Sequence, residues 1–315
     1  MRGMLDAVAR HRVLAAWAML ALLPFIAPSA ALASLIVVMG LYALGFNLLF
    51  GYAGLLSFGH SALIGAGGYA CGIAIVHFGW PWWGAILAGP ATGGLVALAM
   101  GLLAVRTRGI YFAMVTLALS QCVYYVALKA EDWTGGENGL RGVNLTTISL
   151  GFAQFSGIDP MTRYTLVAVC AGIGLAFVSR VLRSPFGAAL SALRENEARA
   201  RACGYDINRI RLQAFVLSGV ISGLAGALYA IQLSVVPIET MHYATSGLAV
   251  MMAILGGMNT FFGPFVGAAI FLAIENVGAL WTEHWPLLAG GVFMACVLFF
   301  REGVWGTLLK RAMPR

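Results

Sequence analysis

The stretch GYAGLLSFGHSALIGAGGYACG runs from Gly51 to Gly72, and seven of its 22 residues are glycine. The chain around it is strongly apolar, with 61% hydrophobic and only 10% charged residues. A glycine inside a helix costs about 0.5–1 kcal/mol relative to alanine, so this many glycines need a compensating gain. Helices in a bilayer associate by close packing at small residues. The stretch therefore predicts a membrane helix that other helices approach closely.

Apolar stretches of similar length fill the rest of the 315-residue chain, whose mean hydropathy is +0.88. A bilayer-spanning helix needs about 20 predominantly apolar residues, and no stretch is polar enough for a soluble domain. We predict an all-α polytopic membrane helical bundle, with a single transmembrane domain over residues 1–315. The expected spans, about ten in number, lie near residues 13–29, 31–50, 56–77, 82–104, 109–128, 164–182, 212–234, 245–258, 262–281 and 285–300.

The basic residues predict the orientation of these spans. If both termini are cytoplasmic and ten spans alternate, the outside receives only three of the 19 Lys and Arg residues, namely Lys129, Arg141 and Arg163. This asymmetry is what the positive-inside rule expects. It places a loop at 129–163 in the periplasm and a segment at 183–211 in the cytoplasm. Nucleic-acid binding is disfavoured, because the basic residues are spread along the loops that flank the spans.

The first apolar stretch has a basic start and contains Pro24 and Pro28, so it also fits a cleaved signal peptide. Cleavage would leave nine spans and would keep every later loop on the same side. We expect the first span to be retained, because the next apolar stretch begins almost immediately after it.

Five polar residues fall inside the expected spans. Polar side chains at membrane depth usually face a bundle interior or a cavity, and a charged one costs about 2.5–3.5 kcal/mol on insertion scales. They are either interhelical hydrogen-bonding groups or residues of a translocation path or gate. We favour the hydrogen-bonding role for His60, and we expect Glu275, the one acidic residue well inside a span, to face the bundle interior. The five residues are Asn47, His60, Gln121, Glu275 and Asn276.

Two pairs of small residues lie four positions apart within the opening stretch, namely Ser61 with Gly65 and Gly68 with Gly72. This spacing puts both members of a pair on one face of a helix, where a second backbone can approach. The preceding GYAGLLSFGH also predicts a broken or re-entrant backbone, which the membrane tolerates where it lines a cavity.

The cytoplasmic segment 183–211 is too polar to span a membrane. Ser184 and Pro185 are typical of a helix start and Gly204 of a helix end, so we predict one amphipathic helix from Pro185 to Cys203. Such a helix either lies at the lipid surface or docks a cytoplasmic protein. Its mixed charge favours docking, because a lipid-binding helix would be more uniformly basic.

The periplasmic loop 129–163 contains DWTGGENGLRGV at residues 132–143. It is too long for a tight turn and too rich in glycine for an extended helix. Long loops are usually either disordered or functional. A disordered connector and a structured loop that faces an outside partner are both open interpretations of these residues.

Six motifs resemble, in this order, signatures of the permease subunits of the high-affinity branched-chain amino acid ABC importers. They are GYAGLLSFGHSALIGAGGYA (51–70), RTRGIYFAMVTLALSQ (106–121), TGGENGL (134–140), SPFGAALSALRENEARARACGYD (184–206), AFVLSGVISGLAGALYA (214–230) and LGGMNTFFGPFVGAAI (255–270). The long outer loop before the cytoplasmic helix resembles one of the family's two permeases more closely. The resemblance implies a type II importer-like fold.

The resemblance also implies partners. They are a second, related permease, two cytoplasmic ATPases and a periplasmic substrate-binding protein, with this chain as a multi-pass protein of the bacterial inner membrane. The residues it assigns to ATPase coupling are Arg194, Glu195, Asn196, Glu197 and Gly204, and those it assigns to the loop facing the binding protein are Gly135, Gly136 and Asn138. One departure is that docking loops of ABC permeases tend to read Glu-Ala-Ala, three residues, Gly, whereas Glu197 lies seven residues before Gly204.

The sequence contains no G-x-x-x-x-G-K-[ST] phosphate loop, so we expect no cofactor on this chain and ATP hydrolysis by partner subunits. Neither a metal-ligand spacing among the five cysteines nor a nucleophile–base pair indicates an enzyme. We expect an importer subunit for branched-chain amino acids that works by alternating access, with urea or short amides as the alternative substrates. A stand-alone secondary transporter or channel would need ion-coupling charges within its spans, and only Glu275 qualifies.

Overall fold

The structure is a computed structural model, and it describes residues 12–144, 147–149, 154–157, 159–281, 284–300 and 302–312. Its helices are α2 (Arg12–Ile26), α3 (Ala30–Asn47), α4 (His60–Val76), α5 (Trp82–Ala104), α6 (Ile110–Lys129), α7 (Glu131–Thr134), α8 (Pro160–Arg183), α9 (Pro185–Glu195), α10 (Glu197–Ala202), α11 (Ile207–Leu233), α12 (Tyr243–Gly256), α13 (Gly263–Trp281), α14 (Trp285–Phe299) and α15 (Gly303–Ala312). The shorter elements are a π-helical turn η1 (Leu48–Tyr52), the 3₁₀ turns η2 (Gly136–Asn138) and η3 (Ile238–Met241), and the strands β1 (Leu140–Arg141), β2 (Thr147–Ser149), β3 (Gln154–Ser156) and β4 (Val235–Val236).

Within the described part of the chain, seven helical segments are long and apolar enough to cross a membrane. They are Ala30–Tyr52, Trp82–Ala104, Ile110–Lys129, Pro160–Arg183, Ile207–Leu233, Gly263–Trp281 and Trp285–Lys310. Three shorter apolar helices, α2, α4 and α12, occupy the remaining stretches that we expected to span. The all-helical membrane bundle is therefore confirmed, whereas these three helices are shorter than a typical span of about 20 residues.

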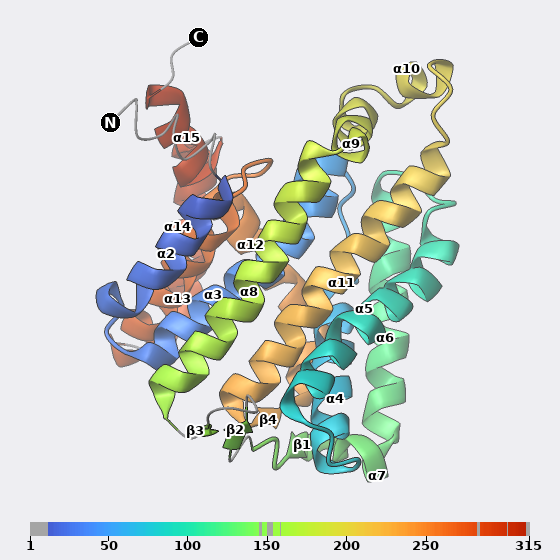
Figure 1. Cartoon of the computed structure of the whole chain (residues 1–315). Helices are drawn as coiled ribbons and strands as arrows, with labels where there is room; N and C mark the ends of the chain where they lie inside the picture. Colours follow the sequence, from blue (N-terminus) through green and yellow to red (C-terminus); the bar gives the residue numbers. More distant parts are fainter. Residues whose placement is uncertain are drawn as a thin grey trace.

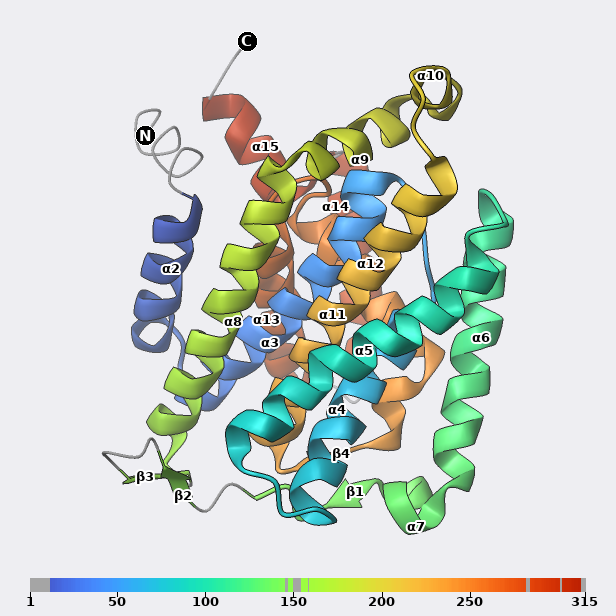
Figure 2. The ribbon, with the colours of Figure 1, turned by 45° about the vertical axis from the view of Figure 1, so that its right-hand side comes forward.

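Helix α11 is the centre of the bundle and packs between α4 and α5 (Figure 2). A Cβ atom added to Gly223 of α11 would clash with the carbonyl of Gly89 and lie 2.9 Å from the Cα of Gly93, both on α5. On its other side, a Cβ added to Gly67 of α4 would lie 2.5 Å from the Cα of Gly223. The backbones of three helices therefore meet at glycine, which is how helices gain contact in lipid. The sequence analysis missed this junction, although Gly89 with Gly93 and Gly219 with Gly223 have the four-residue spacing.

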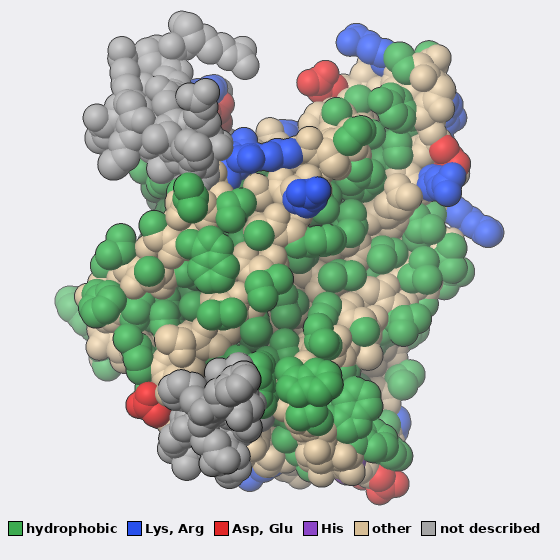
Figure 3. Space-filling model, viewed as in Figure 1, with side chains coloured by type: hydrophobic (Ala, Val, Ile, Leu, Met, Phe, Trp, Pro, Cys, Tyr) green, Lys and Arg blue, Asp and Glu red, His purple; other side chains and the backbone are tan. Residues whose placement is uncertain are grey.

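The two ends of the bundle differ in structure. Helices α9, α10 and α15 and the start of α2 lie at one end, and the strands and α7 lie at the other (Figures 1 and 2). Most Lys and Arg side chains on the visible face gather at the end that carries α10, and the middle of that face is largely hydrophobic (Figure 3). The described chain therefore begins and ends on the side of segment 183–211, opposite the loop 129–163.

The loop after α6 is built onto the body of the protein by a short antiparallel pairing of β1 with β4, in which Leu140 faces Val236. Leu140 and Val143 are buried against the last turns of α4, where a Cβ on Gly72 would lie 2.8 Å from the Leu140 Cδ2 atom. Its first part, residues 131–144, is thus structured. Farther along the loop, β2 and β3 form a second antiparallel pair.

Candidate functional site

The extended segment 54–59 separates η1 from α4, and Figure 2 shows the chain descending through it to the start of α4 inside the bundle. The break predicted before the glycine-rich helix is thus present. Phe58 lies in this segment, and its N–H donates to Thr116 Oγ1 at 3.2 Å. The Phe58 carbonyl accepts from Ser120 Oγ at 3.3 Å and from Ser246 Oγ at 2.8 Å. We call these contacts the Phe58 clamp.

The Phe58 clamp explains how an irregular backbone persists inside an apolar bundle. Such backbone is tolerated at membrane depth only where other groups satisfy its N–H and C=O. Ser246 also accepts the N–H of Ser61 at 2.8 Å, so one hydroxyl serves both sides of the break. The sequence analysis missed Thr116, Ser120 and Ser246; the available signal was a hydroxyl residue inside an apolar span.

His60 is fully buried at the first position of α4. Its Nε2 lies 2.6 Å from the Oγ of Ser218 on α11, and Ser218 donates to the carbonyl of Gly45 on α3 at 2.7 Å. Because Ser218 spends its hydroxyl hydrogen on Gly45, His60 must donate from Nε2. The rings of Phe46 and Phe215 stand edge-on to the imidazole. His60 is thus placed as a link between three helices.

Asn47 is fully buried at the end of α3 and binds the turn between α12 and α13. Its Nδ2 donates to the Thr260 carbonyl at 2.9 Å, and its Oδ1 accepts from the Asn259 N–H at 3.2 Å. Asn259 has φ of +61°, a conformation that residues other than glycine seldom adopt. Asn47 therefore holds a strained turn in place.

The other expected path residues lie farther out. Gln121 is half-buried on α6, and its Nε2 is buried with no partner among the described residues. Glu275 is half-buried on α13, and the neighbouring Asn276 is exposed, with its Nδ2 donating to the Leu272 carbonyl of the same helix at 2.8 Å. An interior position fits Asn47 and His60, whereas Glu275 lies at the edge of the bundle. The expectation that it faces the interior of this chain was wrong, because no helix of the described chain fully covers that face of α13.

The small residues selected from the sequence pack against different partners. A Cβ on Gly65 would clash with Met241 of η3, and one on Gly68 would lie 3.2 Å from the Gly226 carbonyl of α11. Ser61 is fully buried, with its backbone N–H bound to Ser246. Gly72, as described above, is covered by Leu140 of the loop after α6. Close packing therefore occurs at this face of α4.

Segment 183–211 differs from the single helix that we predicted. It contains two helices, α9 and α10, separated at Asn196, where the backbone is extended (φ −160°, ψ 105°). Asn196 Oδ1 caps α10 by accepting the Arg199 N–H at 2.9 Å, and this competing local bond is the physical reason for the break. Pro185 begins α9 as expected. Gly204, at φ +89°, ends α10.

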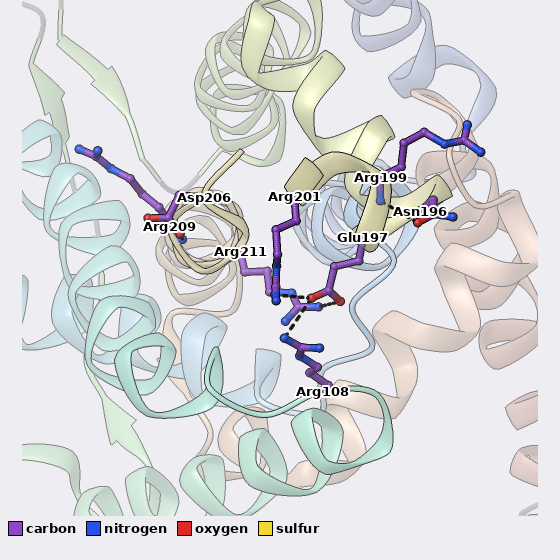
Figure 4. Close-up of polar contacts among 8 residues, drawn as sticks. All are labelled: Arg108, Asn196, Glu197, Arg199, Arg201, Asp206, Arg209 and Arg211. Atoms are coloured by element: carbon purple, nitrogen blue, oxygen red, sulfur yellow. Dashed lines mark hydrogen bonds and ion pairs between the residues drawn. The ribbon is translucent and has the colours of Figure 1, made fainter. Parts of the chain in front are cut away.

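Glu197 joins three arginines from different parts of the chain (Figure 4). Its Oε2 accepts from Arg211 of α11 at 2.6 Å, and its Oε1 lies 3.1 Å from Arg201 of α10 and 3.4 Å from Arg108 between α5 and α6. The Arg211 side chain is 6% exposed and that of Glu197 is 27% exposed. Glu197 therefore fixes α10 to the bundle, whereas the sequence analysis assigned it to contact with a partner.

The remaining coupling residues are accessible. Arg194 and Glu195 are exposed at the end of α9. Arg194 also lines a pocket of about 350 Å³ together with Asn259, Thr260 and Glu302. On the opposite end, Gly135 has φ of +75° and Gly136 φ of +57°, so the turn between α7 and η2 needs glycine at both positions. Asn138 is exposed and lines a pocket of about 470 Å³ with Arg141 and Glu239.

Comparison with known protein families decides the class of this bundle. The model of the family described as "Branched-chain amino acid transport system / permease component" matches residues 29–300. The chain belongs to this permease family. It is therefore an integral membrane transport subunit, and the resemblance drawn from six motifs is confirmed. The permeases of this family are components of transporters, which is not itself an enzymatic role.

Three curated relatives illustrate the range of the family. The Escherichia coli K12 high-affinity branched-chain amino acid transport system permease protein LivM is 28% identical over 297 residues, covering 87% of this chain and 69% of that protein. A probable branched-chain amino acid permease LivM of Methanocaldococcus jannaschii is 25% identical over 275 residues, covering 75% of this chain and 78% of the relative. The autoinducer 2 import permease LsrC of Klebsiella pneumoniae is 30% identical over 217 residues, 66% of this chain and 60% of that protein. No solved structure matches the chain.

Proposed function

We propose that this chain is the permease subunit of an ATP-driven ABC importer for branched-chain amino acids in the bacterial inner membrane. The observation that carries the proposal is the family match over residues 29–300, together with a likeness to LivM over 87% of the chain. The permease would bind no cofactor. It would pair with a second, related permease, two ATPases in the cytoplasm and a periplasmic binding protein.

The proposed topology has ten spans and cytoplasmic termini. The seven long apolar segments and the short helices α2, α4 and α12 supply ten membrane elements. Support for the orientation comes from the basic end, where α9, α10 and α15 lie, because positively charged loops stay inside. Segment 183–211 then meets the ATPases, and the loop with Gly135, Gly136 and Asn138 meets the binding protein.

The proposed mechanism is alternating access. Helix α9 follows α8 after a single residue, Ser184, and α10 is fixed to α11 through the ion pair of Glu197 with Arg211. A movement of the ATPases against α9 and α10 would therefore displace α8 and α11 together. Because α11 is the central helix and contacts α4 through glycine, the displacement would reach the break before His60 and its Phe58 clamp. Asn47, His60, Gln121, Glu275 and Asn276 are the candidate residues for the path or gate.

The test is reconstitution. The permease is co-expressed with the ATPases, the second permease and the binding protein encoded beside it, purified by a tag on this chain and inserted into proteoliposomes. We expect co-purification of an ATPase and ATP-dependent uptake of labelled leucine. Uptake without any ATPase would contradict the importer and support a stand-alone transporter.

The substrate is tested in the same vesicles. An excess of unlabelled isoleucine or valine should suppress leucine uptake, and urea or acetamide should not. Autoinducer 2 is included as a competitor because a relative is named for its import. If ATP-dependent uptake occurs only with urea, an amide or autoinducer 2, the importer class stands and the substrate assignment falls.

A further inference from the structure

The cluster around Glu197 carries more positive than negative charge. Three guanidinium groups, from Arg108, Arg201 and Arg211, converge on one carboxylate (Figure 4). An arginine cannot lose its proton under ordinary conditions, so this imbalance is permanent. A structural ion pair would need only one of these arginines.

Arg211 shows that the cluster lacks acceptors. Its side chain is 6% exposed, and its Nε and Nη1 have no hydrogen-bond partner in the described part of the chain. Glu197 already shares both oxygens among three arginines, so it cannot also serve these two nitrogens. A buried guanidinium with unused donors is costly unless an acceptor completes it. The missing group is a second anion with oxygen acceptors.

The exposed arginines provide the access to this site. The side chains of Arg108 and Arg201 are 59% and 56% exposed, so an approaching anion would meet their guanidinium groups first. They come from the connection between α5 and α6 and from α10, and Glu197 lies between them. An acceptor that bound both would also shield Glu197 and Arg211 from water, which strengthens charged hydrogen bonds.

The position of α10 argues for a protein rather than a lipid as the source of the anion. Helix α10 lies beyond the ends of α8 and α11, away from the hydrophobic middle of the molecule (Figures 1 and 3). Its residues Arg199, Arg201 and Ala202 are followed by the exposed Cys203 and Tyr205. A lipid headgroup site would instead lie at the boundary of the apolar surface.

We propose that Arg108, Arg201 and Arg211 form a socket for a carboxylate of the partner ATPase. The proposal rests on the proposed function, and it assigns docking to the arginines and an internal role to Glu197. A carboxylate fits because its two oxygens match the paired N–H groups of a guanidinium. The socket also links the ATPase to α5, α6 and α11 at a single point.

The test measures binding of the purified ATPase to this permease, held with its second permease in nanodiscs of neutral lipid. The double variant Arg108→Gln/Arg201→Gln removes the exposed part of the socket and keeps the Glu197–Arg211 pair. We expect about tenfold weaker binding at low salt and a shallower dependence of Kd on salt, as for charge pairs at an interface. The double variant must unfold at the wild-type temperature, which confirms that the fold is kept.

The matched control is Arg199→Gln/Arg209→Gln. Both arginines are exposed, lie in the same segment and point away from the socket in Figure 4, and the pair removes the same charge. We expect its Kd to stay within about twofold of wild type. Equal losses in the two double variants would mean that net charge alone attracts the ATPase, and this would overturn the socket.

A second measurement identifies the acceptor. Arg201→Lys places a primary amine in the socket, and a carbodiimide then joins that amine to a carboxylate in contact with it. We expect a covalent product between permease and ATPase, with Arg209→Lys giving none. If only a link to Glu197 forms, or the Arg108→Gln/Arg201→Gln variant binds the ATPase like wild type, the socket is wrong while the importer stands. If loss of binding requires anionic lipid in the nanodisc, a headgroup occupies the site and the proposal is likewise overturned. A wild-type permease that binds no ATPase would instead contradict the proposed function itself.

Discussion

At the scale of single residues, polar groups in this permease are linked in chains rather than in isolated pairs. His60 donates to Ser218, which donates to the Gly45 carbonyl, so three helices share one sequence of hydrogen bonds. A buried polar group that loses its partner costs about 1–3 kcal/mol, more than the bond itself contributes. The middle residue of such a chain is therefore its most sensitive point.

We predict that Ser218→Ala lowers stability by about 1–3 kcal/mol, because it leaves both His60 Nε2 and the Gly45 carbonyl without a partner. Thermal unfolding in detergent should show a clear drop in midpoint. Ser191→Ala is the control, because Ser191 is exposed on α9 and bonds only to the Gly187 carbonyl of its own helix. A Ser218→Ala protein that melts like wild type would mean that His60 does not depend on this link.

We predict that Glu197→Gln loosens α10. The change leaves Arg211 buried without a counter-charge, and breaking a buried pair costs about 3–5 kcal/mol, whereas Arg108 and Arg201 are exposed and contribute little. Amide hydrogen exchange over residues 197–202 should become faster. Glu195→Gln, at an exposed position on α9, should leave this exchange unchanged. Unaltered protection of α10 in Glu197→Gln would contradict the anchoring role.

At the scale of elements, glycine decides how closely the central helices approach. Gly223 of α11 faces the backbones of α5 and α4, and neither backbone can move aside as a flexible side chain can. Gly65, selected from the sequence, instead meets the side chain of Met241. A larger residue is therefore easier to accommodate at Gly65 than at Gly223.

We predict that Gly223→Ala destabilises the bundle. Alanine gains about 0.8–1.0 kcal/mol in helix propensity, whereas overpacking typically costs about 1–3 kcal/mol, and more where backbone blocks the new atom. The yield of folded protein and its unfolding temperature should both fall. Gly247→Ala on α12 is the matched control, since a Cβ there has nothing within 4 Å. If both variants behave alike, α11 does not pack as described.

We predict that Ser246→Ala weakens the Phe58 clamp. The Ser61 N–H would lose its acceptor, and Phe58 would keep only the longer bond from Ser120 at its carbonyl. We expect a loss of about 1–3 kcal/mol in thermal unfolding and a larger one when Thr116→Val is added. Thr165→Val, which removes a bond within exposed α8, should be neutral. Additive, negligible effects of both clamp variants would show that the segment 54–59 does not need them.

At the scale of the whole molecule, the two ends of the bundle face different compartments in the proposed topology. The native Cys203 is exposed beside α10, and Asn138 is exposed at the opposite end. Cys122, also exposed, lies on the apolar helix α6. Reagents that cannot enter the bilayer should therefore distinguish the two ends.

We predict that a membrane-impermeant maleimide labels Cys203 in inside-out vesicles and not in intact cells whose outer membrane has been made permeable. Asn138→Cys, in a Cys203→Ser background, should show the reverse pattern. Cys203→Ser alone should stay unlabelled in both preparations and serves as the control. Labelling of Cys203 from the periplasmic side would reverse the proposed orientation.

The sequence by itself determined the membrane bundle, the permease family and the ends of individual helices. Hydropathy and charge act locally, so runs of apolar residues, Pro185 at a helix start and Gly204 at a helix end could be recognised without a structure. The glycine spacing in α5 and α11 was equally legible and was overlooked. Residue types also indicated that His60 and Asn47 would be buried, although not which groups would bind them.

The tertiary structure alone decided how distant residues meet. Glu197 and Arg211 are 14 positions apart, and Phe58 and Ser246 are 188 apart, so no local pattern links them. The choice at Asn196 between continuing a helix and capping a new one also depended on Glu197 finding its arginines on α11 and beside α6. The physical reason is that a short-range pattern specifies each helix, whereas the pairing of polar groups depends on the packing of several helices at once.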